Sequence, residues 1–284
     1  MTIVLDTPYR STRGRKPSRP AFLFDFHNDA AAGTSVVDRF GNAAAITLQG
    51  TLGTSWTASR GFWRPNGTDQ QAITGTTNEY AGQAVMADGL LTPGGALVVA
   101  WYGGWPGSKN SATEIVLCLG RNNANSASVR IGHGASGPML FQAAGVGASS
   151  STTYTFGSAG LYSSLHSYLM HLEAVAGGIQ ISAWLDGVQV GLLNSFSWTA
   201  NGGSEPTRST FAMTDGITIA AARVGSSAGS PSWANRLGAN PANGYVLGGV
   251  MALHLASAST ATAQAIAVER AQYRRAIGDM LAGV

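Results

Sequence analysis

The sequence predicts an all-β protein, an antiparallel β-sandwich of the jelly-roll type. Charged residues make up only 11% of the 284 residues, less than half of the usual ~25%, which argues against a helical bundle with solvated charged faces. Glycine accounts for 38 residues, nearly twice its usual share of ~7%, as is typical of many short strands joined by tight turns. Apolar residues also recur with the period of two that marks strands.

The first 20 residues differ in composition from the rest and are expected to form an extended arm. Their five basic residues are Arg10, Arg13, Arg15, Lys16 and Arg19. They stand against one acidic residue, whereas residues 21–284 carry 12 basic and 13 acidic residues and are nearly neutral. No aromatic residues are interleaved with the basic ones, so nucleic acid is not the favoured partner. We expect the arm to bind a neighbouring protein subunit.

Residues 21–284 are interpreted as one domain that consists mostly of strands. In chain order, strands are expected at residues 21–26, 96–102, 114–119, 128–131, 168–175, 179–185, 188–190, 217–219 and 246–255. In the first of them, Phe22, Phe24 and Phe26 share one face. Asp186 and Gly187 form a two-residue hairpin signal between two of the later strands.

A helical period appears only near the end of the chain and predicts a short C-terminal helix over about 259–281. Ser259 or Thr260 can cap its N-terminus. The residues that recur at spacings of three and four are Ala263, Ile266, Arg270, Tyr273, Ile277 and Met280.

Four segments carry a resemblance to a known family. Residues 24–26 and the Asp-x-x-Gly-Asn turn at 38–42 are similar to an opening strand and its turn. Residues 62–69, the hairpin strands at 166–191, and residues 244–277 follow in the matching order. Together they resemble the laminin-G-like, concanavalin A-like lectin/glucanase superfamily, of the type found in tailed-phage virion proteins. The resemblance implies a jelly-roll sandwich, and it would allow Ca²⁺, which laminin-G domains often bind.

The sequence shows no sign of catalysis, so we expect a non-enzymatic protein with no cofactor. Glucanases of this superfamily carry Glu-x-Asp-x-x-Glu on one strand, and none of the five glutamates here has an aspartate two residues later. Cys118 is the single cysteine, which excludes an internal disulfide and a CxxC metal site. No metal site is expected among the histidines, which are interpreted as structural: His27, His133, His166, His171 and His254.

Two aromatic clusters beside glycine-rich or polar turns are candidate binding surfaces. The first consists of Trp101, Tyr102 and Trp105, and the second of Trp233, Asn235 and Arg236. Exposed, these side chains could bind a glycan or a protein partner, since Trp and Arg are enriched at interfaces. The alternative is that the aromatic rings cap the core of the sandwich.

The favoured function is a structural component of a tailed-phage-like virion, a capsid or tail decoration protein held by its arm to neighbouring subunits. Such a protein belongs to a symmetric oligomer or a larger assembly. The alternative is a lectin-like, carbohydrate-binding module that contacts host surface glycans. The N-terminus lacks the pattern of a signal peptide and no apolar stretch reaches the ~20 residues of a membrane span, so we expect localisation to the virion and no membrane partner.

Overall fold

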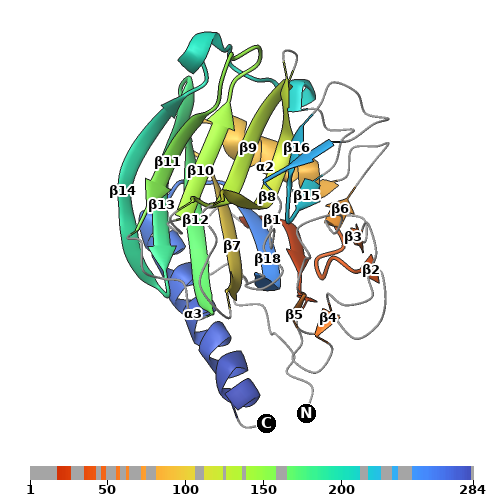
Figure 1. Cartoon of the computed structure of the whole chain (residues 1–284). Helices are drawn as coiled ribbons and strands as arrows, with labels where there is room; N and C mark the ends of the chain where they lie inside the picture. The colour runs from red at the N-terminus through yellow and green to blue at the C-terminus, as the bar shows by residue number, and fades with distance from the viewer. Residues whose placement is uncertain are drawn as a thin grey trace.

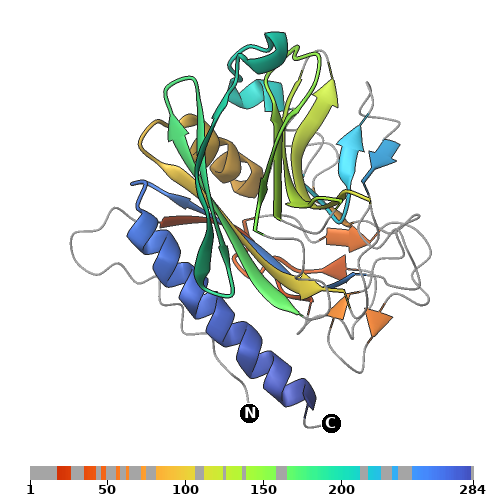
Figure 2. The same cartoon turned by 60° about the vertical axis from the view of Figure 1, so that its left-hand side comes forward.

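The computed structural model of the chain is a sandwich of two β-sheets, which confirms the predicted all-β class (Figures 1 and 2). The structure describes residues 18–26, 35–42, 46–48, 56–57, 62–63, 72–74, 81–105, 112–123, 126–135, 139–157, 165–211, 217–224, 232–235 and 245–282. No helix in these ranges is long and apolar enough to span a membrane.

The first sheet has the strand order β14-β13-β12-β7-β18-β5-β4, and β1 also pairs with β18. All of its described pairings are antiparallel. Its strands are β1 (Ser18–Phe24), β4 (Trp56–Thr57), β5 (Phe62–Trp63), β7 (Ala96–Gly104), β12 (His166–Val175), β13 (Gly178–Leu185), β14 (Val188–Ser197) and β18 (Val246–Leu255).

The second sheet has the strand order β11-β10-β9-β8-β15-β6-β3-β2. Its strands are β2 (Ser35–Val36), β3 (Ile46–Leu48), β6 (Ala72–Thr74), β8 (Glu114–Asn123), β9 (Ser126–His133), β10 (Met139–Ala144), β11 (Thr152–Phe156) and β15 (Ile217–Ile219). A short pair, β16 (Ala222–Val224) and β17 (Ser232–Ala234), joins it through β8. Two 3-10 turns, η1 (Ala200–Gly202) and η2 (Arg208–Phe211), lie between β14 and β15.

Strand alternation separates two apolar layers on the first sheet. In β7, Leu97 and Val99 belong to the core between the sheets, whereas Val98 and Ala100 belong to a second cluster on the outer face. The outer cluster is completed by α3 (Thr260–Ala282), which lies across this face in Figure 2. The first sheet is therefore covered on both faces.

The C-terminal helix lies where the sequence predicts it, within one residue at each end. Its cap is Ser259, whose hydroxyl accepts a hydrogen bond from the Thr262 N–H at 3.2 Å. Ala263, Ile266 and Ala267 then pack on the first sheet.

A second helix, α2 (Ala81–Leu91), is not predicted by the sequence. It lies between the two sheets in Figure 2 and packs Val85, Met86, Ala87 and Leu90 into the shared core. A helix that is apolar on most of its surface shows no amphipathic period, so the pattern that revealed α3 is missing here. The expectation of a single helix is corrected accordingly.

The expected start of the first strand is also corrected. Strand β1 begins at Ser18 rather than at residue 21, and Arg19 and Pro20 pair with His254 and Leu253 of β18. Arg19 is therefore a strand residue. Arg10, Arg13, Arg15 and Lys16 lie outside the described residues, so the extended arm remains a prediction for that segment.

Two predicted turns have clear physical causes. The Asp38 carboxylate accepts hydrogen bonds from the backbone N–H groups of Leu23, Phe40 and Asn42 at 2.7, 3.0 and 2.7 Å, which fastens the turn after β2 to strand β1. Asp186 and Gly187, both with positive φ, form the expected two-residue hairpin between β13 and β14.

Candidate functional site

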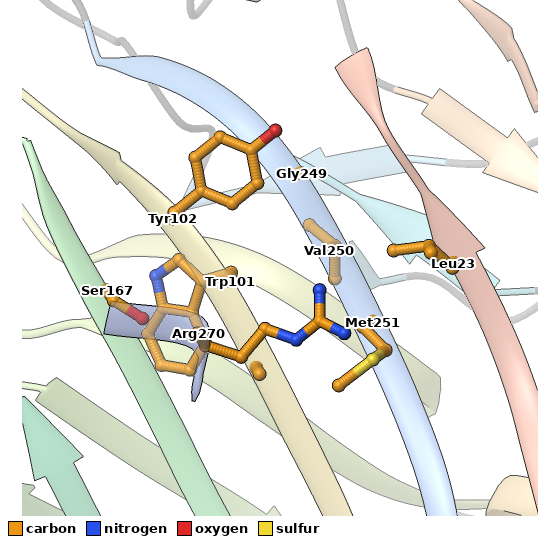
Figure 3. Close-up of a pocket in the computed structure, with 9 residues that line it drawn as sticks. Leu23, Trp101, Tyr102, Ser167, Gly249, Val250, Met251 and Arg270 are labelled. Carbon is orange, nitrogen blue, oxygen red and sulfur yellow. The ribbon is translucent and has the colours of Figure 1, made fainter. Parts of the chain in front are cut away.

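A small pocket opens on the outer face of the first sheet, beside α3 (Figure 3). It is lined by Leu23, Ala100, Trp101, Tyr102, Ser167, Gly249, Val250, Met251 and Arg270. These residues come from β1, β7, β12, β18 and α3, so the pocket exists only in the folded sandwich. Its cavity volume is about 10 Å³, the room of roughly one water molecule and far below the ~300–1,000 Å³ of typical small-molecule sites, so the pocket does not hold a whole ring as it stands.

One wall of the pocket is the ring of Tyr102, and a glycine makes room for it. A Cβ on Gly249 would lie 2.5 Å from Cε1 of that ring, so no larger residue fits there without moving the tyrosine. The Tyr102 hydroxyl donates a hydrogen bond to the buried Asp25 carboxylate at 3.0 Å. The hydrogen bond fixes the tip of the ring, and Gly249 leaves the space that the ring fills.

The opposite wall is the side chain of Arg270, the only charged residue in the lining. It is 12% exposed, and Figure 3 shows its guanidinium group over β18, beside Val250 and Met251. Its NH2 lies 3.7 Å from Oε1 of Glu269, which is an ion pair longer than a hydrogen bond. The pocket thus combines one positively charged side chain with a mostly apolar lining.

This arrangement suits binding rather than bond cleavage. The lining brings together the charged group of Arg270, the aromatic ring of Tyr102 and the hydroxyl of Ser167. The lining contains no carboxylate pair of the kind that hydrolyses a glycosidic bond.

The expectation of exposed aromatic platforms is corrected for Trp101, Tyr102 and Trp105. All three are buried, with exposures of 2%, 7% and 1%. Both tryptophans belong to the core cluster, which agrees with the alternative that aromatic rings cap the sandwich core. Strand β7 is central and covered on both faces, and this explains why none of its side chains forms a surface platform.

Trp101 and Trp105 instead help to form a buried polar cluster between the sheets. The Trp105 indole donates to Oε2 of Glu114 at 3.0 Å, and the Trp101 indole donates to Nε2 of His133 at 3.4 Å. His133 also lies 3.3 Å from the Tyr245 hydroxyl. Burial raises the pKa of that hydroxyl well above its usual value, so Tyr245 stays neutral. Glu114, His133 and Tyr245 are fully buried, and we assign the cluster a structural role.

Of the other predicted binding residues that the structure describes, none lines this pocket. Arg19 binds Asp88 of its own chain at 2.9 Å. Trp233 is in β17, and the backbone carbonyl of Asn235 accepts a hydrogen bond from the Ile115 N–H at 2.8 Å. Arg236 lies outside the described residues. The second aromatic cluster therefore remains a prediction.

Among the described residues, no three His, Cys, Asp or Glu side chains are placed to hold a metal ion. His166 instead lies 2.6 Å from Asp186. Burial lowers the pKa of His171 from 6.5 to about 4, and burial with the nearby Arg19 lowers that of His254, so both are neutral at pH 7. Cys118 is buried. His27 lies outside the described residues, so the Ca²⁺ expectation is not tested there.

The sequence interpretation missed Arg270, Ser167 and Gly249 as site residues. One signal was present: Arg270 occupies the apolar stripe of the C-terminal helix, at spacings of four and three from Ile266 and Ala267. A charge on the stripe that faces a sheet is costly unless it has a partner or a purpose. Nothing in the sequence indicated which strand residues would surround it.

No protein-family model matches the chain, and no curated protein matches it. Several solved structures are similar to it in fold. The binding domain of botulinum neurotoxin DC, in complex with rat synaptotagmin II, is 12% identical over 89% of this chain and 52% of that one, with a TM-score of 0.51. The CBM40 of the Ruminococcus gnavus IT-sialidase, bound to α2,3-sialyllactose, is 11% identical over 66% of this chain and 88% of that one, with a TM-score of 0.41.

This chain spans about half the length of the neurotoxin binding domain that it matches. At 12% identity the likeness shows the fold alone, a β-sandwich. Fold and pocket together define the class: a jelly-roll sandwich with a cationic pocket on its helix-covered sheet.

Proposed function

We propose that this protein is a non-catalytic binding module of the lectin type and that its ligand contacts the surface at the Tyr102–Arg270 pocket. The observation that carries the proposal is the position of Arg270, a charged side chain held beside an aromatic ring in an apolar lining. The sandwich shared with a toxin binding domain supports the class, as does the resemblance of several segments to the concanavalin A-like superfamily.

The test uses a glycan array and two glycine variants. Gly249→Ala places a Cβ 2.5 Å from the Tyr102 ring and so reshapes the pocket. Gly191→Ala is the matched control, because its Cβ would lie 2.3 Å from the Phe156 ring, away from the pocket. Both variants should lose stability, and only Gly249→Ala should lose glycan binding per folded molecule. Equal loss in both variants, or no binding of any glycan by the wild type, would overturn the proposal.

The uneven charge distribution favours a second candidate function, a capsid or tail decoration protein of a tailed-phage-like virion. Five of the 17 basic residues lie in the first 20 positions, and a nearly neutral surface is suited to coverage by neighbouring subunits. Because Arg19 binds its own sandwich, the contact with neighbours falls to Arg10, Arg13, Arg15 and Lys16. Deletion of residues 1–17 should prevent incorporation into particles, and normal incorporation would exclude this role for the segment.

A further inference from the structure

A buried positive charge lies on the outer face of the second sheet. Arg130 is in β9, a central strand between β8 and β10 (Figure 1). Its chain neighbours Val129 and Ile131 belong to the core between the sheets, so the side chain of Arg130 points to the outer face, where it is only 5% exposed. We propose that Arg130 binds a small monovalent anion of about the size of chloride. This site is independent of the proposed function, because it lies on the other sheet from the Tyr102–Arg270 pocket.

One edge of the Arg130 guanidinium group is unpaired. Nη1 donates a hydrogen bond to Oε1 of Gln142 on β10 at 3.0 Å. Nε and Nη2 are buried and have no hydrogen-bond partner among the residues that the structure describes. These two nitrogens form one edge of the planar group, from which two parallel N–H bonds point in the same direction. This edge is therefore a two-donor site that suits an anion.

The charge of the guanidinium group argues for an anion rather than a water molecule as the missing partner. Arginine stays protonated when it is buried, and a charge taken out of water is strongly unfavourable unless an opposite charge lies close to it. In the described part of the chain, no acidic side chain forms an ion pair with Arg130. A water molecule would satisfy the two N–H groups and leave the charge uncompensated, whereas an anion does both.

The surroundings restrict the anion in size and in charge. Across the neighbouring strands, Arg130 pairs with Cys118 of β8 and with Gln142 of β10. Cys118 and Leu140 belong to a buried apolar cluster that Ala222 of β16 joins. A large ligand does not reach nitrogens that are covered in this way, whereas a halide ion is only slightly larger than a water molecule. One guanidinium charge beside an apolar cluster also matches one negative charge and not two.

The guanidinium group is held in place by a row of polar side chains. Gln142 accepts the hydrogen bond from Arg130, and its own Nε2 donates one to the Thr153 hydroxyl of β11 at 3.1 Å. The three residues lie directly opposite one another in the register of β9, β10 and β11. Ser128, two residues before Arg130 and so on the same face of β9, has a buried hydroxyl that also lacks a partner among the described residues. A fixed donor edge lowers the entropy lost when an ion binds.

The experiment measures thermal unfolding of the full chain while sodium chloride replaces sodium gluconate at constant ionic strength. Gluconate is too large for the site and is the reference anion. We expect chloride to raise the Tm of the wild type by about 2–4 °C and the effect to saturate, because the ion binds only the folded state. Arg130→Met should lose this response, and Arg130→Lys should keep part of it. Arg208→Met, which changes an exposed arginine of η2, should keep all of it.

A crystal grown in sodium bromide locates the ion directly, because bromide scatters anomalously. We expect a peak in contact with Nε and Nη2 of Arg130 in the wild type and no peak there in Arg130→Lys or Arg130→Met. A carboxylate of the chain in contact with these nitrogens, a wild type without a saturable chloride response, or the same response in Arg130→Met would overturn the inference. If Arg130→Met does not fold, the wild-type titration, Arg130→Lys and the bromide peak decide. Glycan binding enters none of these results, so the two proposals fail separately.

Discussion

At the scale of single residues, a few buried polar side chains help to fix how the two sheets pack together. Trp105 with Glu114, and His133 with Tyr245, form buried hydrogen-bonded pairs in the core. Such a pair costs free energy if either member is left without a partner, so it favours one arrangement of the two sheets. The sequence suggested that Trp105 was either a surface platform or a cap of the core, and its burial decides between the two.

The buried side chain of His171 leads to a prediction of how the stability of the fold depends on pH. It lies on the outer face of β12 with its ring edge toward Trp184, and burial lowers its pKa to about 4. Because the folded pKa lies below the unfolded value of 6.5, the unfolded state binds more protons between these values. Stability is therefore complete above pH 6.5 and falls as the pH drops toward 4, by on the order of 3 kcal/mol.

Urea unfolding of the wild type and of His171→Leu across this range measures the effect. The wild type should lose stability on acidification, and the variant should lose less, with the remaining slope due partly to His254, whose lowered pKa acts in the same direction. Identical pH dependence in both proteins would contradict the assignment to His171.

At the scale of elements, α3 is held to the β13–β14 hairpin. Gly187 has φ +83°, and a Cβ there would lie 3.2 Å from Cα of Val268. Gly177, in the preceding hairpin, has φ +71° with no atom near its Cβ position. Alanine at Gly177 thus incurs only backbone strain of ~1 kcal/mol, whereas alanine at Gly187 adds displacement of the helix and should cost ~2–3 kcal/mol.

Chemical denaturation of Gly187→Ala and Gly177→Ala tests this attachment. The Gly187 variant should be the less stable of the two and should also bind ligand more weakly, because Arg270 follows Val268 on the displaced helix. Equal losses of stability in the two variants would show that the hairpin does not position α3.

The elements that could be predicted are those with a clear period or turn signal. The hairpin at Asp186, the strands around Val98 and Met251, and the capped helix after Ser259 all have such patterns. Helix α2 could not be predicted because its apolar surface faces the core on several sides. Whether this segment forms a helix depends on the space between the two sheets, and that space is set by the tertiary fold.

At the scale of the whole molecule, the pocket is the feature that the sequence did not predict. Its lining comes from five elements that are distant in the chain, and Arg270 is more than 100 residues from Ser167. The charge within the helical stripe was visible, but the Tyr102 ring, the Gly249 gap and the Asp25 partner meet it only after the strands have paired. Binding sites formed in this way follow from packing and not from a local motif.

The most direct test of the central claim is to locate the bound ligand. Backbone amide signals of the isotopically labelled protein are recorded by nuclear magnetic resonance while the glycan that binds most tightly on the array is added. The account predicts that shifts concentrate at Tyr102, Ser167, Met251 and Arg270, on the outer face of the first sheet. Shifts centred on β9–β11 of the second sheet, with the pocket signals unchanged, would contradict it.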